Sequence, residues 1–179
     1  ITERIKVYIM QIALIADDQK KELLNQFCIA YCGILSKQRI CATSRTGKSV
    51  AEATGLDVEC LLPASHGGVQ QISSRVSYDE VDIVIFFRDS SIESSTNEIA
   101  LDLLRLCDIH NVPVATNIAS AEVIIRGLER GDIDWRELVN PKSDFNLRRR
   151  AIREMEEARA AREADKRRRE SKRSKKTGL

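Results

Sequence analysis

Three loops of the chain combine residue types that handle phosphate groups and protons. Each follows an apolar run, and their sequences are ADDQKK at residues 16–21, ATSRTGKS at 42–49 and PASHGGVQQ at 63–71. The first mixes carboxylates with lysines, and the second offers hydroxyls and an arginine at an expected helix start, where the backbone favours anions. In the third, paired glycines let backbone amides approach a ligand closely. The three loops together predict a site for a small phosphorylated molecule.

Each loop also has a purely structural interpretation, which stays open at this point. Asp17 can cap a helix while the lysines after it lie in solvent, and His66 can be a structural histidine. The end of the second loop, GKS at residues 47–49, imitates a nucleotide-binding P-loop. However, Ala42 stands where that motif begins with glycine, and no acidic partner for magnesium is evident. A nucleotide triphosphatase is therefore disfavoured.

The elements that must position these loops alternate between apolar runs and amphipathic stretches. Residues 81–87 are almost continuously apolar, as central strands of parallel sheets are. The expected strands are 5–16, 39–43, 58–62, 81–87 and 112–116, and the expected helices are 20–32, 48–54, 69–76, 98–110 and 119–128. This order predicts an α/β fold, a doubly wound parallel five-stranded sheet flanked by helices. Ligands of such sheets bind at the carboxyl ends of the strands, where the three loops fall.

The strand and helix pattern stops near Pro141, which predicts two parts: a domain at residues 1–143 and a tail at 144–179. The tail carries 14 Lys and Arg against 7 Asp and Glu, and its composition favours a long basic helix that frays toward its end. Such a charge asymmetry suggests an anionic partner. The residues expected to contact RNA or a partner are Arg148, Arg149, Arg150, Lys166, Arg167, Arg168, Arg169, Lys172, Arg173, Lys175 and Lys176.

Composition bounds the remaining possibilities. The five cysteines follow no disulfide framework and no set of Cys and His has the spacing of a metal site, so we expect buried thiols, a reducing compartment and no metal. No apolar run approaches the length of a membrane span. The chain begins with Ile1 rather than methionine, which fits either a removed organellar leader or a partial sequence.

Two further segments complete a pattern that resembles a known family. IFFRD at residues 85–89 and NVPVATNIASA at 111–121 follow the three loops in order. With the ATSRTG loop they resemble the methylglyoxal synthase family, from about Ile12 to Leu128. The resemblance implies conversion of dihydroxyacetone phosphate into methylglyoxal and inorganic phosphate without a cofactor. It also implies a doubly wound α/β domain that is typically homohexameric, and related domains serve as regulatory ligand-binding modules.

On the phosphate side, the resemblance keeps several of the family's groups. Lys21, Thr43, Thr46 and Gly68 match its lysine, two threonines and a glycine, whereas Arg45 replaces a further threonine. The family's Ser-Gly-Pro before the glycines becomes PAS at residues 63–65. The resemblance therefore implies a phosphate-binding remnant in these loops.

On the catalytic side, most of the family's groups are replaced. Its catalytic aspartate falls at Val69, its catalytic histidine near Thr96 and a nearby acidic residue near Ile99. Two family aspartates remain, at Asp18 and Asp89. A valine cannot move a proton, and one positioned acid or base contributes about 10²–10⁴-fold to a rate. On this ground we expect a chain that is not an enzyme and has no catalytic residues.

The replaced groups and the basic tail together predict a structural subunit of a larger assembly. The leading hypothesis is an organellar ribonucleoprotein such as a ribosome, in a mitochondrion or plastid, with RNA or protein subunits as partners and the cytoplasm as the alternative location. Homo-oligomerisation through the α/β domain is a further possibility, without membrane insertion. The alternatives are a phosphometabolite-sensing module and a degenerate methylglyoxal synthase that uses Asp17 or Asp18 as its base.

Overall fold

The structure, a computed structural model, describes residues 9–91, 96–133, 135 and 150–165, without the side chains of 96 and 97. The chain divides into two compact units, Ile1–Asn140 and Pro141–Leu179. The boundary expected between residues 143 and 144 lies outside the described residues. No helix in the described part of the chain is long and apolar enough to cross a membrane.

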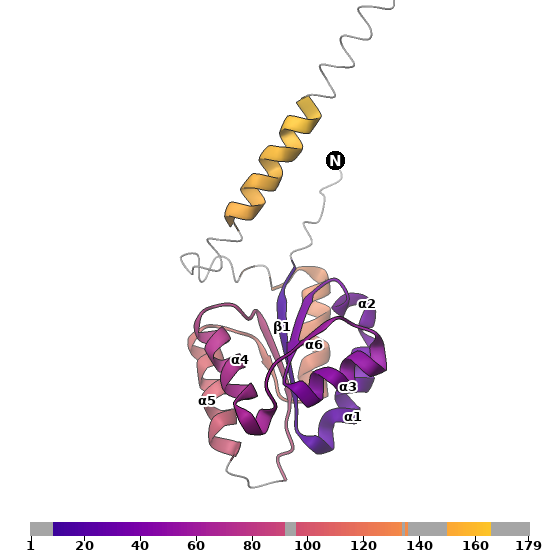
Figure 1. The fold of residues 1–179 in the computed structure, drawn as a ribbon, viewed down its shortest axis with the longest axis vertical. Coiled ribbons are helices and arrows are strands. Elements are labelled where there is room, and N and C mark those ends of the chain that lie inside the picture. The colour runs from indigo at the N-terminus through magenta and orange to yellow at the C-terminus, as the bar shows by residue number, and fades with distance from the viewer. Residues whose placement is uncertain (1–8, 92–95, 134, 136–149, 166–179) are drawn as a thin grey trace, which may run out of the picture. The chain divides into compact units, whose positions relative to one another are not determined.

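The first unit is built on one parallel sheet of five strands (Figure 1). In sheet order the strands are β3 (Val58–Cys60), β2 (Arg39–Ala42), β1 (Gln11–Ala16), β4 (Ile83–Phe87) and β5 (Val114–Ala115), and every neighbouring pair is parallel. The two strands at the centre, β1 and β4, are almost wholly buried, which explains their continuous apolar sequences. This sheet confirms the predicted α/β fold class.

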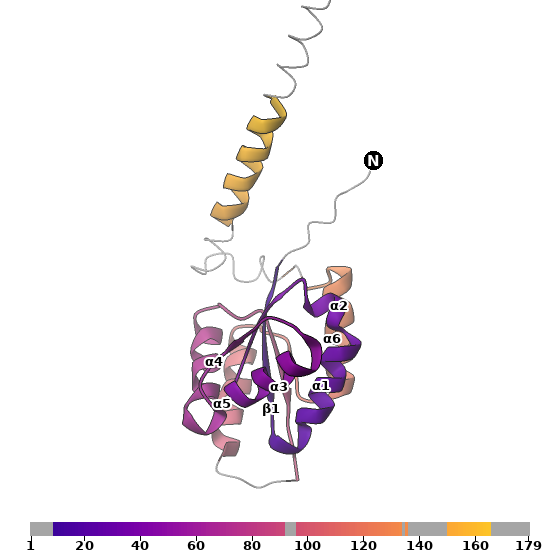
Figure 2. The ribbon, with the colours of Figure 1, turned by 45° about the vertical axis from the view of Figure 1, so that its right-hand side comes forward.

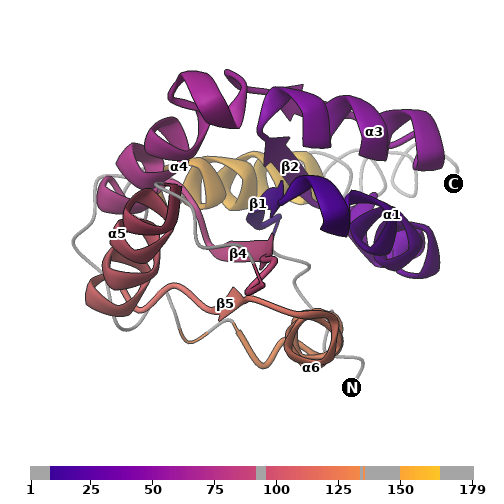
Figure 3. The same ribbon diagram turned by 90° about the horizontal axis from the view of Figure 1, so that it is seen from below.

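Helices cover both faces of the sheet. They are α1 (Lys21–Ala30), α2 (Cys32–Leu35), α3 (Ser44–Thr54), α4 (Gly68–Ser77), α5 (Thr96–Ile109) and α6 (Ile118–Arg130). Figures 1 and 2 show α4 and α5 together on one side of the sheet, and the view from below in Figure 3 places α1 and α6 on the other side. Two short 3-10 turns, Asp18–Lys20 and Ala64–His66, lie in the polar loops.

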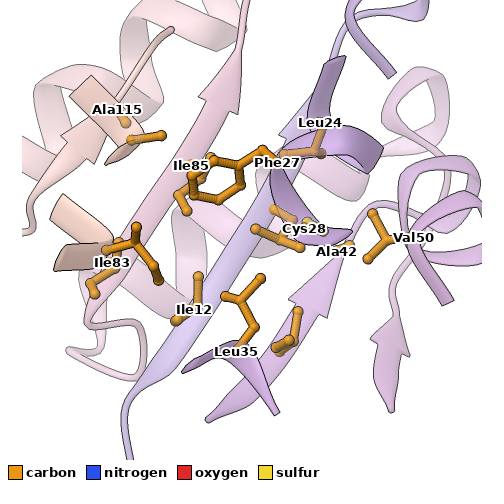
Figure 4. Packing of buried hydrophobic residues seen from close by; sticks show 14 of the residues in the cluster. Ile12, Leu24, Phe27, Cys28, Leu35, Ala42, Val50, Ile83, Ile85 and Ala115 are labelled. Atoms are coloured by element: carbon orange, nitrogen blue, oxygen red, sulfur yellow. The ribbon is translucent and has the colours of Figure 1, made fainter. Parts of the chain in front are cut away.

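Two apolar clusters, one on each face of the sheet, hold these layers together. Successive side chains of β1 alternate between them: Ile12 and Leu14 belong to the cluster under α1 and α6, whereas Ala13 and Ile15 belong to the cluster under α4 and α5. Figure 4 shows the first cluster, where Phe27 of α1 lies over the sheet. Because both faces of the sheet are packed against helices, its strands are held in place. The polar loops follow directly at the ends of these strands.

One helix differs from its sequence prediction in a way that matters for the site. We expected a helix over residues 48–54, but α3 begins four residues earlier, at Ser44. The first turn carries Ser44, Arg45 and Thr46, which have no apolar periodicity and so gave no helical signal. The Ser44 N–H donates to the Leu62 carbonyl at 3.2 Å, a tertiary contact that the sequence does not reveal. The polar residues of the second loop are therefore the first turn of a helix.

Within the second unit the structure describes a helix over residues 150–165. Arg159 and Glu163, one helical turn apart, form an ion pair at 3.3 Å on this helix. Of the basic residues expected to contact a partner, Arg150 lies in the helix, and the other ten lie outside the described residues. Their contact with an anionic partner stays a prediction.

Candidate active site

A pocket of about 440 Å³ opens at the carboxyl ends of the strands. Four loops line it: those after β1, β2 and β4, and the one that leads into α4. The lining residues are Ile15, Ala16, Asp17, Asp18, Gln19, Lys21, Thr43, Arg45, Thr46, Pro63, Ala64, Ser65, Val69, Phe86, Arg88, Asp89, Ile99 and Ala100. A doubly wound sheet is expected to bind ligands at this edge.

The N-terminus of α3 forms one wall of the pocket. The first N–H groups of a helix have no partner within it, and the helix dipole favours an anion there. Thr43 precedes the helix with an extended backbone and Thr46 lies in its first turn; they are 2% and 1% exposed. The Thr43 hydroxyl donates to the Thr46 hydroxyl at 3.1 Å. This wall therefore presents hydroxyls and backbone donors that are already fixed in place.

Cationic side chains flank this wall. Lys21, at the start of α1, forms an ion pair with Asp18, whereas Arg45 lies exposed at the start of α3. The hydrogen bond and charge of Lys21 hold the pKa of Asp18 below its ordinary value, with a smaller contribution from the charge of Arg45. Arg88, directly after β4, adds a third cation to the lining. An anion at the start of α3 would meet positive charge on more than one side.

The loop before α4 is held in one conformation by backbone contacts. The Pro63 carbonyl accepts hydrogen bonds from the N–H groups of His66 at 2.9 Å and Gly68 at 3.0 Å. A Cβ atom at Gly68 would lie 2.0 Å from the Leu62 carbonyl oxygen, so no other residue fits there without displacing backbone. Gly67 adopts a φ of 92°, in the region that glycine favours. Gly68, which was predicted as part of the phosphate site, is not among the residues that line the pocket, and its close contact with Leu62 holds this loop.

Val69, in the first turn of α4, belongs to the pocket lining and to the core at once. It is 7% exposed and packs in the cluster that contains Ile15, Phe86 and Ala100. These side chains, with Ile99 of α5, make an apolar wall. The pocket therefore has a polar wall at α3 and an apolar wall at α4 and α5.

Three carboxylates lie at the mouth between these walls. An Asp17 carboxylate oxygen accepts the Asp89 N–H at 2.7 Å, which ties the loop after β1 to the loop after β4. One carboxylate oxygen of Asp89 accepts from the N–H and the hydroxyl of Ser91, at 3.1 and 2.6 Å. These hydrogen bonds keep the pKa of Asp89 below its ordinary value. Both carboxylates therefore already serve as hydrogen-bond acceptors.

The structure brings most of the predicted site residues together. Lys21, Thr43, Arg45 and Thr46 line one pocket, and Asp18, Val69 and Asp89 line the same pocket. Thr96 is the first residue of α5, and its side chain lies outside the described residues. Within the described ranges, no three His, Cys, Asp or Glu side chains lie close enough to hold a metal ion.

Sequence reasoning gave no role to two groups that the structure places at the pocket. Arg88 lines the pocket. Its position directly after a buried strand could have indicated this from the sequence. The Ser65 hydroxyl lines it as well and lies 2.9 Å from Nδ1 of His66. No sequence signal identifies this contact, because it depends on the 3-10 turn of residues 64–66.

The fold and the pocket together define a doubly wound α/β protein. Its pocket lies at the carboxyl ends of the strands and carries groups that favour an anion. No protein-family model matches the chain. Proteins described as "Methylglyoxal synthase" match it strongly, however: that of Caldicellulosiruptor saccharolyticus is 54% identical over 137 residues, 76% of this chain and 97% of its own length. That of Thermoanaerobacter sp. (strain X514) is 51% identical over 72% of this chain and 98% of its own length.

A solved structure agrees with these relatives. The crystal structure of methylglyoxal synthase from Elizabethkingia anophelis NUHP1 matches with a TM-score of 0.59 and 32% identity, covering 65% of this chain and 77% of the other. The chain belongs to the methylglyoxal synthase family, as its resemblance predicted.

Two expectations from the sequence are wrong. Relatives that are 44–54% identical over nearly their whole length are named for an enzyme, so the chain is not to be interpreted as a non-enzymatic structural subunit of a ribonucleoprotein. The first error was to infer inactivity from positions that were interpreted as replaced, although the pocket keeps carboxylates and cations. The second was to infer RNA from the tail, because a dense run of positive charge attracts any anion. Ribosomal, mitochondrial and plastid assignments conflict with these bacterial relatives.

Proposed function

We propose that the chain is a lyase that converts dihydroxyacetone phosphate into methylglyoxal and inorganic phosphate. One observation carries the proposal: a single pocket joins the α3 N-terminus, Lys21 and Arg45 to carboxylates, in a chain 54% identical to a protein named methylglyoxal synthase. The phosphate group would require the first set of groups, and the keto and hydroxymethyl end would lie beside the second.

In the proposal, the phosphate binds at the start of α3. On binding, the Thr43 hydroxyl proton turns from Thr46 to the phosphate, so that both hydroxyls and the free N–H groups of the helix donate to phosphate oxygens. Lys21 and Arg45 neutralise its charge. Hydrogen bonds that involve a charged group contribute about 1.5–3 kcal/mol each. This arrangement favours a compact dianion over a neutral sugar.

The proposed reaction needs proton transfers and one bond cleavage. A base removes a proton from the hydroxymethyl carbon, which gives an enediolate. The enediolate then expels phosphate by breaking the carbon–oxygen bond, and the resulting enol becomes methylglyoxal by moving its hydroxyl proton to the terminal carbon. The proton lost from carbon leaves on phosphate, so the substrate dianion yields neutral methylglyoxal and the hydrogen phosphate dianion. The substrate neither gains electrons from another molecule nor loses electrons to one. The proposal therefore names no cofactor.

We also propose that the α/β domain forms homo-oligomers in the cytoplasm. Leu101 of α5 and Val123 of α6 are 56% and 70% exposed apolar side chains, which a partner subunit in the proposed oligomer would cover. The five free cysteines fit a reducing compartment. Sedimentation of the purified chain would test the assembly, and a monomer at micromolar concentration would contradict it.

The central test is to incubate the purified chain with dihydroxyacetone phosphate and measure methylglyoxal and phosphate together. We expect the two products in equal amounts. Lys21→Gln should lower kcat/KM by about 10²-fold, since it removes a charged donor from the phosphate. Lys37→Gln is the matched control, because Lys37 is exposed in the turn that enters β2, away from the pocket lining. Binding of the substrate without either product would contradict the proposal.

A further inference from the structure

The proposed reaction requires a group that takes a proton from carbon, and Val69 cannot do so. The identity of that group rests on the proposed function, because only this reaction requires it. Candidates are the titratable or hydroxyl side chains of the pocket that can accept a proton while the phosphate binds at α3. A general base works best when its pKa lies near the working pH.

The pocket carboxylates are poorly suited to this role. Asp18 is paired with Lys21, and Asp89 accepts two hydrogen bonds from Ser91; the pKa of each lies below its ordinary value for these reasons. Lowering a pKa stabilises the charged carboxylate and weakens it as a base. Asp17 holds the Asp89 N–H with one of its oxygens and thereby joins two loops. Each of these carboxylates is therefore already engaged with a neighbouring group of the pocket.

The loop that leads into α4 offers a different acceptor. The Ser65 hydroxyl lines the pocket, and its oxygen lies 2.9 Å from Nδ1 of His66. The backbone of the loop is fixed by the Pro63 carbonyl and by the close approach of Gly68 to Leu62, and it carries the two exposed side chains directly before the first turn of α4. Val69 lies in that same turn. Histidine is the side chain type whose charge change ordinarily falls near neutral pH.

We propose that Ser65 and His66 together take the proton in this reaction. Ser65 is the catalytic residue: its oxygen receives the proton from the hydroxymethyl carbon while its own proton moves to Nδ1 of His66. This requires the tautomer of His66 that carries its proton on Nε2. The imidazolium then returns a proton through Ser65 to the departing phosphate, so both side chains end neutral. His66 acts through Ser65 and is a positioning residue.

Charged groups of both signs line the pocket that Ser65 lines. Those that line the same pocket are Asp17, Asp18, Lys21, Arg45, Arg88 and Asp89. Carboxylates favour the imidazolium and cations oppose it, so the two sets act in opposite directions. The rate of methylglyoxal formation should show an inflection with pH that depends on the histidine. This inflection should disappear when His66 is replaced.

The test compares wild type, Ser65→Ala and His66→Gln by two measurements. One is methylglyoxal formation across pH, and the other is exchange of the hydroxymethyl hydrogens of dihydroxyacetone phosphate with solvent deuterium, followed by NMR. Each variant should lower kcat and the exchange rate by about 10²-fold with KM changed less than twofold. His66→Gln should also remove the acid limb of the pH profile. His110→Gln, at the other histidine, is the matched control and should leave both rates unchanged.

The outcomes separate this inference from the proposed function. A wild-type chain that exchanges hydrogen but forms no methylglyoxal would contradict the proposed lyase, and loss of that exchange in Ser65→Ala and His66→Gln would still support the base. Normal turnover and an unchanged pH profile in His66→Gln would overturn the inference while the lyase stands. A wild-type chain that neither exchanges hydrogen nor forms product overturns both. Stabilisation of every variant by inorganic phosphate, measured as a shift in Tm, should persist and shows that the pocket is folded.

Discussion

The two walls of the pocket are built in different ways. At α3, Thr43 and Thr46 are buried polar groups that hydrogen bond to one another, and the helix backbone faces the ligand. At α4, Val69 is a buried apolar side chain that continues the core. One wall thus keeps donors ready for an anion, while the other excludes water and contributes no charge. On the proposals above, binding depends on the α3 wall, and proton transfer depends on Ser65 and His66 in the loop before α4.

The largest expected effect follows from removing the donors of the α3 wall. The double variant Thr43→Val/Thr46→Val should lower kcat/KM by about 10³-fold, since it removes two hydrogen bonds to a charged group. Its stability should change little, because both partners of the buried hydrogen bond are replaced together and Thr43 makes no side-chain cap.

The single variant Thr46→Val is the control for that interpretation. It leaves the buried Thr43 hydroxyl without its partner, which should cost about 1–3 kcal/mol of stability in urea unfolding. If the double variant binds dihydroxyacetone phosphate as tightly as wild type in calorimetry, the α3 wall is not the phosphate site.

The next largest effect concerns the loop that joins the two walls. Gly68→Ala should lower the free energy of unfolding by about 3 kcal/mol, because its Cβ would lie 2.0 Å from the Leu62 carbonyl oxygen. Gly33→Ala is the matched control: nothing lies within 4 Å of a Cβ there, and the residue is helical. Urea unfolding would check both variants. A Gly68→Ala chain as stable as wild type would show that the loop backbone shifts to accommodate the added methyl group at little cost.

A carboxylate placed in the apolar wall tests whether the α4 side of the pocket excludes water. Val69→Asp should lower the free energy of unfolding by about 2 kcal/mol at pH 7, since the site is buried among apolar side chains. Burial raises the folded-state pKa of a carboxyl above its unfolded value, so this penalty exists above the unfolded pKa and fades as pH falls below it. Val69→Ala controls for the lost contacts and should show no such pH dependence. An equal penalty for Val69→Asp at pH 4 and pH 7 would mean that the wall is open to water.

The fold could be predicted from the sequence because its signals are local and redundant. Ile83 and its neighbours in β4 form a wholly apolar strand, and each amphipathic stretch follows a strand in turn. The start of α3 could not be predicted, because the turn at Ser44 depends on the Leu62 carbonyl from another loop. Local pattern reveals an element, but not the tertiary contact that extends it.

The site was predictable in part for the same reason. Lys21 and Thr46 carry a recognisable loop pattern, and the structure places them at one pocket. The Ser65 and His66 contact and the lining role of Arg88 depend on three-dimensional placement, which spacing in the sequence does not encode. The interpretation of Val69 as the place of a missing carboxylate stays a prediction, and its consequence depends on what else surrounds the pocket.

The smallest expected effect concerns how α4 is fastened to the sheet. Arg75 of α4 donates two hydrogen bonds to Glu59 of β3, at 2.8 and 2.5 Å, and these hold the pKa of Glu59 below its ordinary value. The pair is partly exposed, so Glu59→Gln should cost less than about 1 kcal/mol at pH 7. Because the folded pKa is lowered, the stabilisation exists above the unfolded pKa of a glutamate and is lost as pH falls through the folded value.

Urea unfolding of wild type and Glu59→Gln should therefore differ at pH 7 and converge as the solution is acidified below about pH 4. Glu52→Gln, on the exposed face of α3, is the matched control and should show no such difference. Turnover should fall only slightly in Glu59→Gln, since the apolar packing of Val69 and Ile72 holds α4 by itself. A large loss of turnover with little loss of stability would mean that this ion pair, rather than the apolar wall, sets the position of α4 against the pocket.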